Sequence, residues 1–364
     1  MSIKITKYTI IVLSAYCSLI GCSNSGSKTE ISVPISVNPA VELVSTIHYL
    51  AGTGQYHEGM LPDYLKRIEN YFGKSRDHSA VTLAKEMNRS DGINGSAPMA
   101  LAVYLGAPPL LETVCDMSPR PKDLESRWTP DLIDTFLTEA RRFARDTRFM
   151  DFFNSQKDFH AKAVSNLEET LRDEDILSWY KDFFGYSPKN CRLYIGLING
   201  TCNYGFSVTH RSGKQEFLAL LGARNPGWDG VPRYSKEWFI PVIIHEYIHS
   251  YINPLINDNP EQYRELGEAL LVSHRQKMIK HGYNAWNVLL FEYIVRACSI
   301  HYFQIEDGDK RAQELIDCDE RDGFSEIRGL VKLLSEYENN RTEYPDIGSF
   351  LPNIKAYFES CLIE

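Results

Sequence analysis

Residues 239–249 read FIPVIIHEYIH, with an apolar run that leads directly into two histidines, His245 and His249. Residues four apart lie about one turn apart on the same face of an α-helix, so both imidazole rings can point toward one position. The apolar run indicates that this segment is buried, and a buried histidine pair is costly unless it has a metal or carboxylate partner. The stretch therefore predicts a buried helix that carries a metal site.

The five residues His245-Glu246-Tyr247-Ile248-His249 have the HExxH spacing of zinc hydrolases. In such a motif both histidines bind Zn²⁺, and the glutamate beside the first reaches a water rather than the metal, as a general base must. We therefore predict a zinc cofactor held by His245 and His249, with Glu246 as the catalytic residue. The alternative is a pair of core histidines that make polar contacts on an apolar helix. Asn253-Pro254 is expected to end this helix just after the motif.

A tetrahedral catalytic zinc also needs a third protein ligand, and two glutamates are candidates. Glu292 lies in the apolar run VLLFEYIVRA of residues 288–297, where a carboxylate needs a strong partner. An ion pair with Arg296, four residues further on, is the alternative, and the two are compatible because an arginine could orient a ligating carboxylate. Glu268 follows His249 after eighteen residues, but its charged neighbours make its helix look solvated. We favour Glu292 and keep Glu268 as its rival.

Strand-like runs precede the motif helix, and helical periodicity dominates the rest of the chain. The runs cover residues 192–198, 205–209 and 216–221, with turn residues at Asn199-Gly200 and Ser212-Gly213. Three antiparallel strands are the natural interpretation. The sequence therefore predicts an α+β fold that is predominantly helical, with a small antiparallel sheet.

The predicted helices fall on both sides of these strands. Residues 38–186 show apolar positions at three- and four-residue spacing, and Thr129-Pro130 is a plausible helix start. After the strands, helices are expected over residues 236–252, 260–281, 285–303, 310–316, 324–336 and 347–362.

The motif helix together with the run around Glu292 resembles a family of exported, Bacteroidetes-type proteins described as a domain of unknown function (DUF4932), which has a gluzincin-like signature. The resemblance covers about residues 193–302. It implies a zincin-like catalytic domain over residues 189–364 and peptidase activity by analogy. The helical N-terminal region over 38–188 is predicted from its periodicity and lies outside the resemblance. In zincins a small sheet lies beside the HExxH helix, and its edge strand pairs with an extended substrate.

The first residues read as an export signal. Lys4 and Lys7 precede an apolar run too short to span a membrane comfortably, and the run ends in Leu19-Ile20-Gly21-Cys22. This ending resembles the bacterial lipobox, which implies a lipoprotein signal peptide over 1–21, lipidation of Cys22 and anchoring to the outer membrane or cell envelope. Residues 22–37 would form a flexible tether. The alternative is an ordinary secretory signal or an uncleaved anchor.

Composition excludes several classes of protein. Hydrophobic residues make up 43% and aromatic residues 12% of the chain, which excludes wholesale disorder. The formal net charge of -9 argues against a nucleic-acid partner. The six cysteines after residue 22 permit disulfides in an oxidising compartment, for example Cys191 with Cys202 or Cys318 with Cys361. The chain has no CxxC spacing, so a cysteine-ligated zinc is not expected.

Three function classes follow from these observations. The leading one is a zinc peptidase that acts on a peptide or protein substrate. The others are an envelope lipoprotein that binds glycan or peptide around a structural or relic metal site, and a zinc hydrolase of a non-peptide substrate. A structural site would not require Glu246, which counts against the second class. An oxyanion donor is also expected, and the sequence does not choose among Tyr263, Tyr283, His274 and His301.

Overall fold

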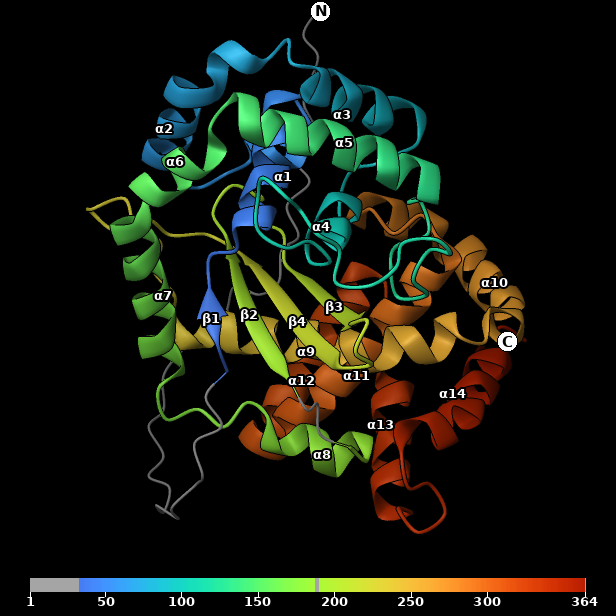
Figure 1. The fold of residues 1–364 in the computed structure, drawn as a ribbon. Helices are drawn as coiled ribbons and strands as arrows, with labels where there is room; N and C mark the ends of the chain where they lie inside the picture. The colour runs from blue at the N-terminus through green and yellow to red at the C-terminus, as the bar shows by residue number, and fades with distance from the viewer. Residues whose placement is uncertain (1–32, 187–189, 364) are drawn as a thin grey trace, which may run out of the picture. The chain divides into compact units, whose positions relative to one another are not determined.

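The computed structural model describes residues 33–186 and 190–363 (Figure 1). Helices dominate this part of the chain, and a small mixed sheet accompanies them, which confirms the predicted α+β class. The signal peptide predicted over residues 1–21, the lipidation site Cys22 and most of the tether lie outside the described residues. None of the helices in the described ranges combines the length and the apolar composition needed to cross a membrane.

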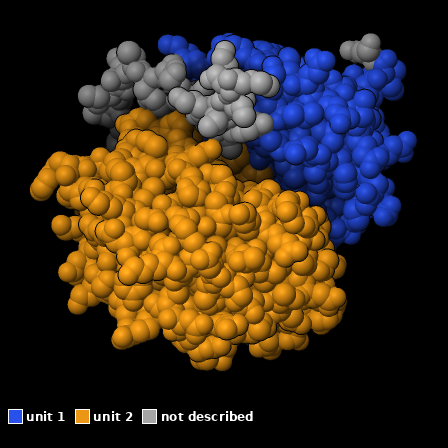
Figure 2. Space-filling view, turned by 90° about the horizontal axis from the view of Figure 1, so that it is seen from above, with its two compact units in different colours: residues 1–30, 175–187, 251–364 blue, residues 31–174, 188–250 orange. Residues whose placement is uncertain are grey.

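The chain forms two compact units, which Figure 2 colours separately. One unit, here called the sheet unit, consists of residues 31–174 and 188–250. The other, the helical unit, comprises the described residues of 175–187 and 251–364. Each unit is therefore built from separate stretches of the sequence.

The sheet has four strands in the order β1-β2-β4-β3. Their bounds are Ile35–Ser36 for β1, Cys191–Gly196 for β2, Tyr204–Thr209 for β3 and Gln215–Gly222 for β4. β1, β2 and β4 run parallel, and β3 is antiparallel to β4. The prediction of a wholly antiparallel sheet is therefore wrong, because β2 pairs with β4 instead of β3. Much of β2 and nearly all of β4 are buried, which is typical of parallel strands.

The two predicted turns differ in what they connect. At Ser212-Gly213 a tight turn joins β3 to β4, with the His210 amide donating to the Lys214 carbonyl at 2.8 Å. Residues 199–200 do not close a hairpin, because β4 lies between β2 and β3 and the chain crosses to the far edge of the sheet. Gly200 has a positive φ of 71° and packs against the backbone of Gln55, so glycine is required there.

Seven α-helices in the sheet unit precede β2. They are α1 (Pro39–Leu50), α2 (Pro62–Phe72), α3 (Ser79–Ser90), α4 (Ala97–Ala102), α5 (Pro130–Asp146), α6 (Phe149–Ser155) and α7 (Lys157–Leu171). α1 is buried along most of its length and lies between the end of β2 and the helices α3 and α5 (Figure 1). α5 begins as predicted, because the Thr129 side chain accepts a hydrogen bond from the Leu132 amide at 3.3 Å.

The motif helix α9 spans Lys236–Asn257 and is longer than expected. The predicted stop at Asn253-Pro254 is wrong, since the helix continues through Pro254. Proline removes one hydrogen bond from a helix interior. The following residues are nevertheless helical, and Ile256 is fully buried, as are Tyr251 and Ile252 before the proline. Packing of these side chains outweighs the local preference for a break.

The helical unit has α11 (Trp286–Asp307) at its centre, packed against α10, α12 and α13. Its other helices are α8 (Ser178–Phe184), α10 (Pro260–Met278), α12 (Asp309–Asp322), α13 (Ile327–Asn339) and α14 (Ile347–Cys361), with a 3₁₀ turn η3 over Ile279–His281. The predicted helices are therefore present, although α12 extends beyond residue 316 and α13 begins three residues late.

All six cysteines in the described part of the chain are free thiols. The suggested pairs do not form. Cys191 begins β2 and Cys202 precedes β3, and these strands are not neighbours because β4 separates them. The hairpin geometry that made this pair attractive is therefore absent.

Candidate metal centre

The two motif histidines direct their ring nitrogens toward each other on α9. Their Nε2 atoms lie 3.2 Å apart, and the ring planes are inclined at 77°. Two nitrogen ligands of a tetrahedral zinc, each about 2.0–2.1 Å from the metal, are about 3.3 Å apart. The separation of the two Nε2 atoms therefore fits a pair of zinc ligands.

The sheet fixes the position of this helix through contacts on two strands. The Tyr247 hydroxyl donates to the Arg192 carbonyl of β2 at 3.0 Å, and the Ser250 hydroxyl donates to the Phe206 carbonyl of β3 at 2.9 Å. At Gly205, β3 passes so close to α9 that a Cβ there would lie 2.7 Å from the carbonyl carbon of Glu246. A glycine inside a strand signals such a close approach, and the sequence interpretation overlooked it.

Glu246 is a buried charged residue, with 8% of its surface exposed. Burial raises the pKa of the Cys202 thiol, and the charge of Glu246 adds to this shift. The charge of Glu246 therefore acts on the Cys202 thiol within the sheet unit. Glu246 follows His245 directly on the motif helix and is largely shielded from bulk water.

Glu292 is held by two hydrogen bonds in the helical unit. Its Oε2 accepts from the Tyr283 hydroxyl at 3.1 Å and from Arg296 Nε at 3.3 Å. The expected ion pair with Arg296 is therefore present. Arg296 extends the network, donating to Asp319 Oδ1 at 2.7 Å and to the Tyr283 hydroxyl at 3.1 Å.

This network is almost closed to water. The side chains of Glu292, Arg296 and Asp319 are each 12% exposed. Burial disfavours the charge of Arg296, but Asp319, Tyr283 and Glu292 raise its pKa above the ordinary value. The guanidinium therefore remains a cation between two carboxylates. Asp319 was not anticipated, because its acidic surroundings over residues 317–322 look like a solvated helix face.

Three predicted ligands form one group. His245, His249 and Glu292 each offer one ligand atom, and these atoms all lie within 4.8 Å of one another. Two imidazoles and a carboxylate are a donor set of catalytic zinc sites. The rival Glu268 is exposed on α10 and belongs to no such group within the described residues.

Two of the four oxyanion candidates, Tyr283 and His274, are hydrogen-bonded to carboxylates, and a third, His301, lies close to one without a hydrogen bond. Tyr283 donates its only hydroxyl proton to Glu292, His274 Nε2 lies 3.0 Å from Glu326 Oε1, and His301 Nε2 lies 2.9 Å from Glu338 Oε2. Tyr263 is buried in α10. The contacts of these four side chains do not single out an oxyanion donor.

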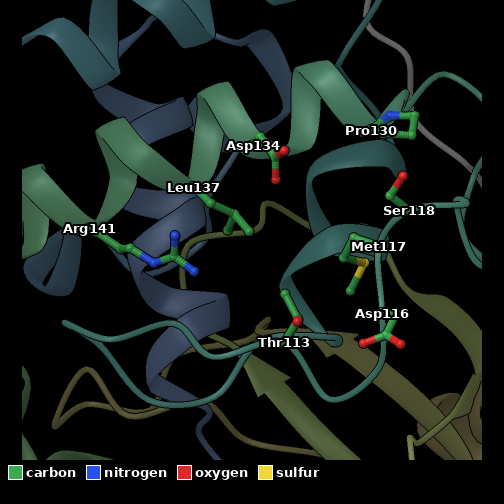
Figure 3. Close-up of a pocket in the computed structure, with 8 residues that line it drawn as sticks. All are labelled: Thr113, Asp116, Met117, Ser118, Pro130, Asp134, Leu137 and Arg141. Carbon is green, nitrogen blue, oxygen red and sulfur yellow. The ribbon is translucent and has the colours of Figure 1, made fainter.

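The sheet unit also has an open pocket of about 350 Å³ beside α5 (Figure 3). Pro130, Asp134, Leu137 and Arg141 line it from the helix, and Thr113, Asp116, Met117 and Ser118 line it from the preceding loop. None of the predicted site residues is among them. The Arg141 guanidinium donates to the Leu110 and Leu111 carbonyls at 2.7 and 3.1 Å, which ties it to the loop.

Comparison with known proteins gives one family. A family model described as "Domain of unknown function (DUF4932)" matches residues 120–357, a range that includes α5, the motif helix α9 and α11. The match begins well before residue 193, so part of the helical N-terminal region belongs to the same family domain. No curated protein and no solved structure matches the chain.

Proposed function

The chain belongs to the DUF4932 family, whose model matches more than half of it, and we propose that it is a zinc-dependent hydrolase, specifically a peptidase. The family description supplies no activity, so the proposal rests on the site. Its main support is the 3.2 Å separation of the Nε2 atoms of His245 and His249 on an HExxH helix that also carries the buried Glu246. Glu292 completes the proposed ligand set.

The chemistry divides between the metal and the chain. Bound zinc would lower the pKa of a water molecule and polarise the scissile carbonyl. Glu246 takes a proton from the attacking water and delivers it to the leaving nitrogen. His245, His249 and Glu292 hold the metal in place for this reaction. A purely structural zinc site would have no use for Glu246.

The sheet supports a peptide as the substrate. β3 lies at the edge of the sheet, and Gly205 brings it against the motif helix. An edge strand offers backbone N–H and C=O groups to which an extended peptide can add as a further strand. Two carbonyls of β3 already accept side-chain hydrogen bonds, Ser207 from Tyr104 at 3.3 Å and Phe206 from Ser250 at 2.9 Å, so such pairing would begin at Gly205 or before it.

Export and lipid anchoring at Cys22 belong to the same proposal, on the evidence of residues 4–22. Growth of the native bacterium with labelled palmitate tests this point. The wild-type chain should take up label and enter the membrane fraction, whereas Cys22→Ser should take up none. Equal labelling of both would refute lipidation at Cys22.

Glu246→Gln tests the catalytic assignment, since the amide keeps the size of the side chain and cannot accept the proton. We expect the wild type to cleave an unstructured protein such as reduced casein, and the variant to retain zinc but lose cleavage. Glu237→Gln is the matched control, because Glu237 is an exposed glutamate in the first turn of α9. It should cleave like the wild type.

The same experiment distinguishes the two alternatives. A zinc-loaded wild type that cleaves no peptide would indicate a hydrolase of another substrate class. A wild type that binds no zinc would indicate a binding lipoprotein and refute the metal centre. Equal cleavage by the wild type and Glu246→Gln would refute Glu246 as the base.

A further inference from the structure

We propose that Tyr283, Arg296 and Asp319 are positioning residues, which hold the Glu292 carboxylate in the orientation that metal binding requires. None of the three is among the proposed metal ligands. The inference rests on the proposed function, because it assumes that Glu292 is a ligand. The inference adds that zinc affinity depends on the carboxylate of Asp319, which lies on α12, next to the helix that carries Glu292.

The arginine side chain gives the network its geometry. The guanidinium is planar, and its donors point in fixed directions. Asp319 engages Nη1 at 2.7 Å and the Tyr283 hydroxyl engages Nη2 at 3.1 Å. With those two donors fixed, Nε is directed at Oε2 of Glu292, 3.3 Å away. Asp319 therefore controls the direction of a hydrogen bond that it does not make.

Tyr283 adds a second constraint on the same oxygen. It accepts from Arg296 and donates to Glu292 Oε2 at 3.1 Å, so it bridges the two side chains. It comes from the loop before α11, whereas Asp319 comes from α12. Oε2 is therefore restrained directly by Tyr283 and Arg296, and indirectly by Asp319, which fixes Arg296. A carboxylate fixed in this way loses little side-chain freedom when it binds a metal.

Stability alone is a poor explanation for this cluster. An i,i+4 ion pair contributes only slightly to the stability of a helix. Two carboxylates and one guanidinium buried together are costly, and apolar residues of similar size often stabilise a protein as well or better. Phe324 lies against the Arg296 guanidinium, with the ring centroid 4.5 Å away. An apolar side chain in place of Arg296 would therefore have an aromatic ring to pack against. A role in orienting Glu292 accounts for the buried charges.

Outer residues of this kind affect metal affinity by about 10- to 100-fold. Asp319→Asn keeps an oxygen that can accept from Arg296 but removes the charge that anchors it. Tyr283→Phe removes one hydroxyl and preserves the ring. Arg296→Lys keeps the positive charge but loses the planar set of donors of the guanidinium. It therefore shows whether zinc affinity depends on the charge at this position or on the direction of the hydrogen bonds.

The test is the zinc dissociation constant of the purified full-length chain, measured by competition with a chromophoric chelator. Urea unfolding of the metal-free proteins is measured in parallel. The matched control is Asp317→Asn, an exposed aspartate on α12 that pairs with Arg328. We expect the three network variants to bind zinc about 10- to 100-fold more weakly. The control should stay within about twofold of the wild type.

A merely structural role predicts a different pattern, in which the metal-free proteins lose stability but the folded proteins bind zinc normally. Wild-type zinc affinity in folded Asp319→Asn and Tyr283→Phe would overturn the inference. If Asp319→Asn does not fold, Tyr283→Phe decides alone. The Co²⁺-substituted proteins provide a second readout, because a reoriented Glu292 changes the visible ligand-field spectrum and a merely less stable fold does not.

The outcome is distinct from a failure of the proposed function. If the wild type binds one zinc and the network variants bind it equally well, only the positioning role fails. If the wild type binds no zinc, the proposed function fails, and the positioning role fails with it.

Discussion

Gly205→Ala is the most informative change to the contact between β3 and the motif helix. A methyl group at this position would lie 2.7 Å from the carbonyl carbon of Glu246 and 2.9 Å from the Cβ of His249. It would lie closer still to the Glu246 carbonyl oxygen. Ordinary carbon contacts begin at 3.4 Å, so β3 and α9 must separate by at least about 0.7 Å.

This displacement predicts two measurable losses. Overpacking of a well-packed region costs about 1–3 kcal/mol, and the obstacle here is backbone that cannot rotate away. Zinc sites tolerate deviations of only about 0.2 Å in ligand distances, so a shift several times larger at the helix that carries His249 should weaken zinc binding markedly. Both losses should therefore appear together.

The assay combines urea unfolding of the metal-free protein with zinc titration of the folded protein. Gly54→Ala is the matched control, because a Cβ at Gly54 meets no atom within 4 Å. The control should change the free energy of unfolding by no more than about 0.5 kcal/mol and leave zinc affinity unchanged. If Gly205→Ala behaves like this control in both measurements, the close packing of β3 on α9 is refuted.

Three further changes test the fold around the site. Burial raises the pKa of Glu42 from 4.5 to about 8. Between these two pH values the folded chain keeps a proton that the unfolded chain has lost, so the free energy of unfolding should fall as pH rises from about 4.5 to about 8. Relative to Glu42→Gln, urea unfolding should show the wild type losing about 4 kcal/mol between pH 5 and 9; parallel pH profiles would contradict this. Thr129→Ala should cost about 1 kcal/mol by removing the cap of α5, and an unchanged urea midpoint would argue against that cap. Tyr247→Phe should cost about 0.5–1.5 kcal/mol through loss of the bond to the Arg192 carbonyl, and an equal free energy of unfolding would show that this bond contributes nothing.

The parts of the site that the sequence predicted are those with a local signal. His245 and His249 are four residues apart on one helix, so their proximity follows from helix geometry alone. Glu292 is predicted as a ligand because it is a carboxylate in an apolar run, and its pairing with Arg296 follows from the same four-residue spacing. These three inferences needed no knowledge of the tertiary fold.

The remaining features depend on contacts between distant segments. Asp319 on α12 pairs with Arg296 on the neighbouring helix α11, and nothing in its own acidic segment indicates burial. The pairing of β2 with β4 depends on where the chain crosses the sheet, and β1 has only two residues, too few for a period. Helix α9 continues through Pro254 because of side-chain burial that the local sequence does not reveal. Tertiary packing decided each of these points.

The most direct test of the central claim is the zinc content of the purified chain after equilibrium dialysis, measured by plasma mass spectrometry. The account predicts one zinc per chain for the wild type and for Glu268→Ala, and none for His245→Ala or Glu292→Ala. The exposed position of Glu268 makes its variant the matched control. The account would be contradicted by a wild type without zinc, or by a loss of zinc in Glu268→Ala while Glu292→Ala retains it.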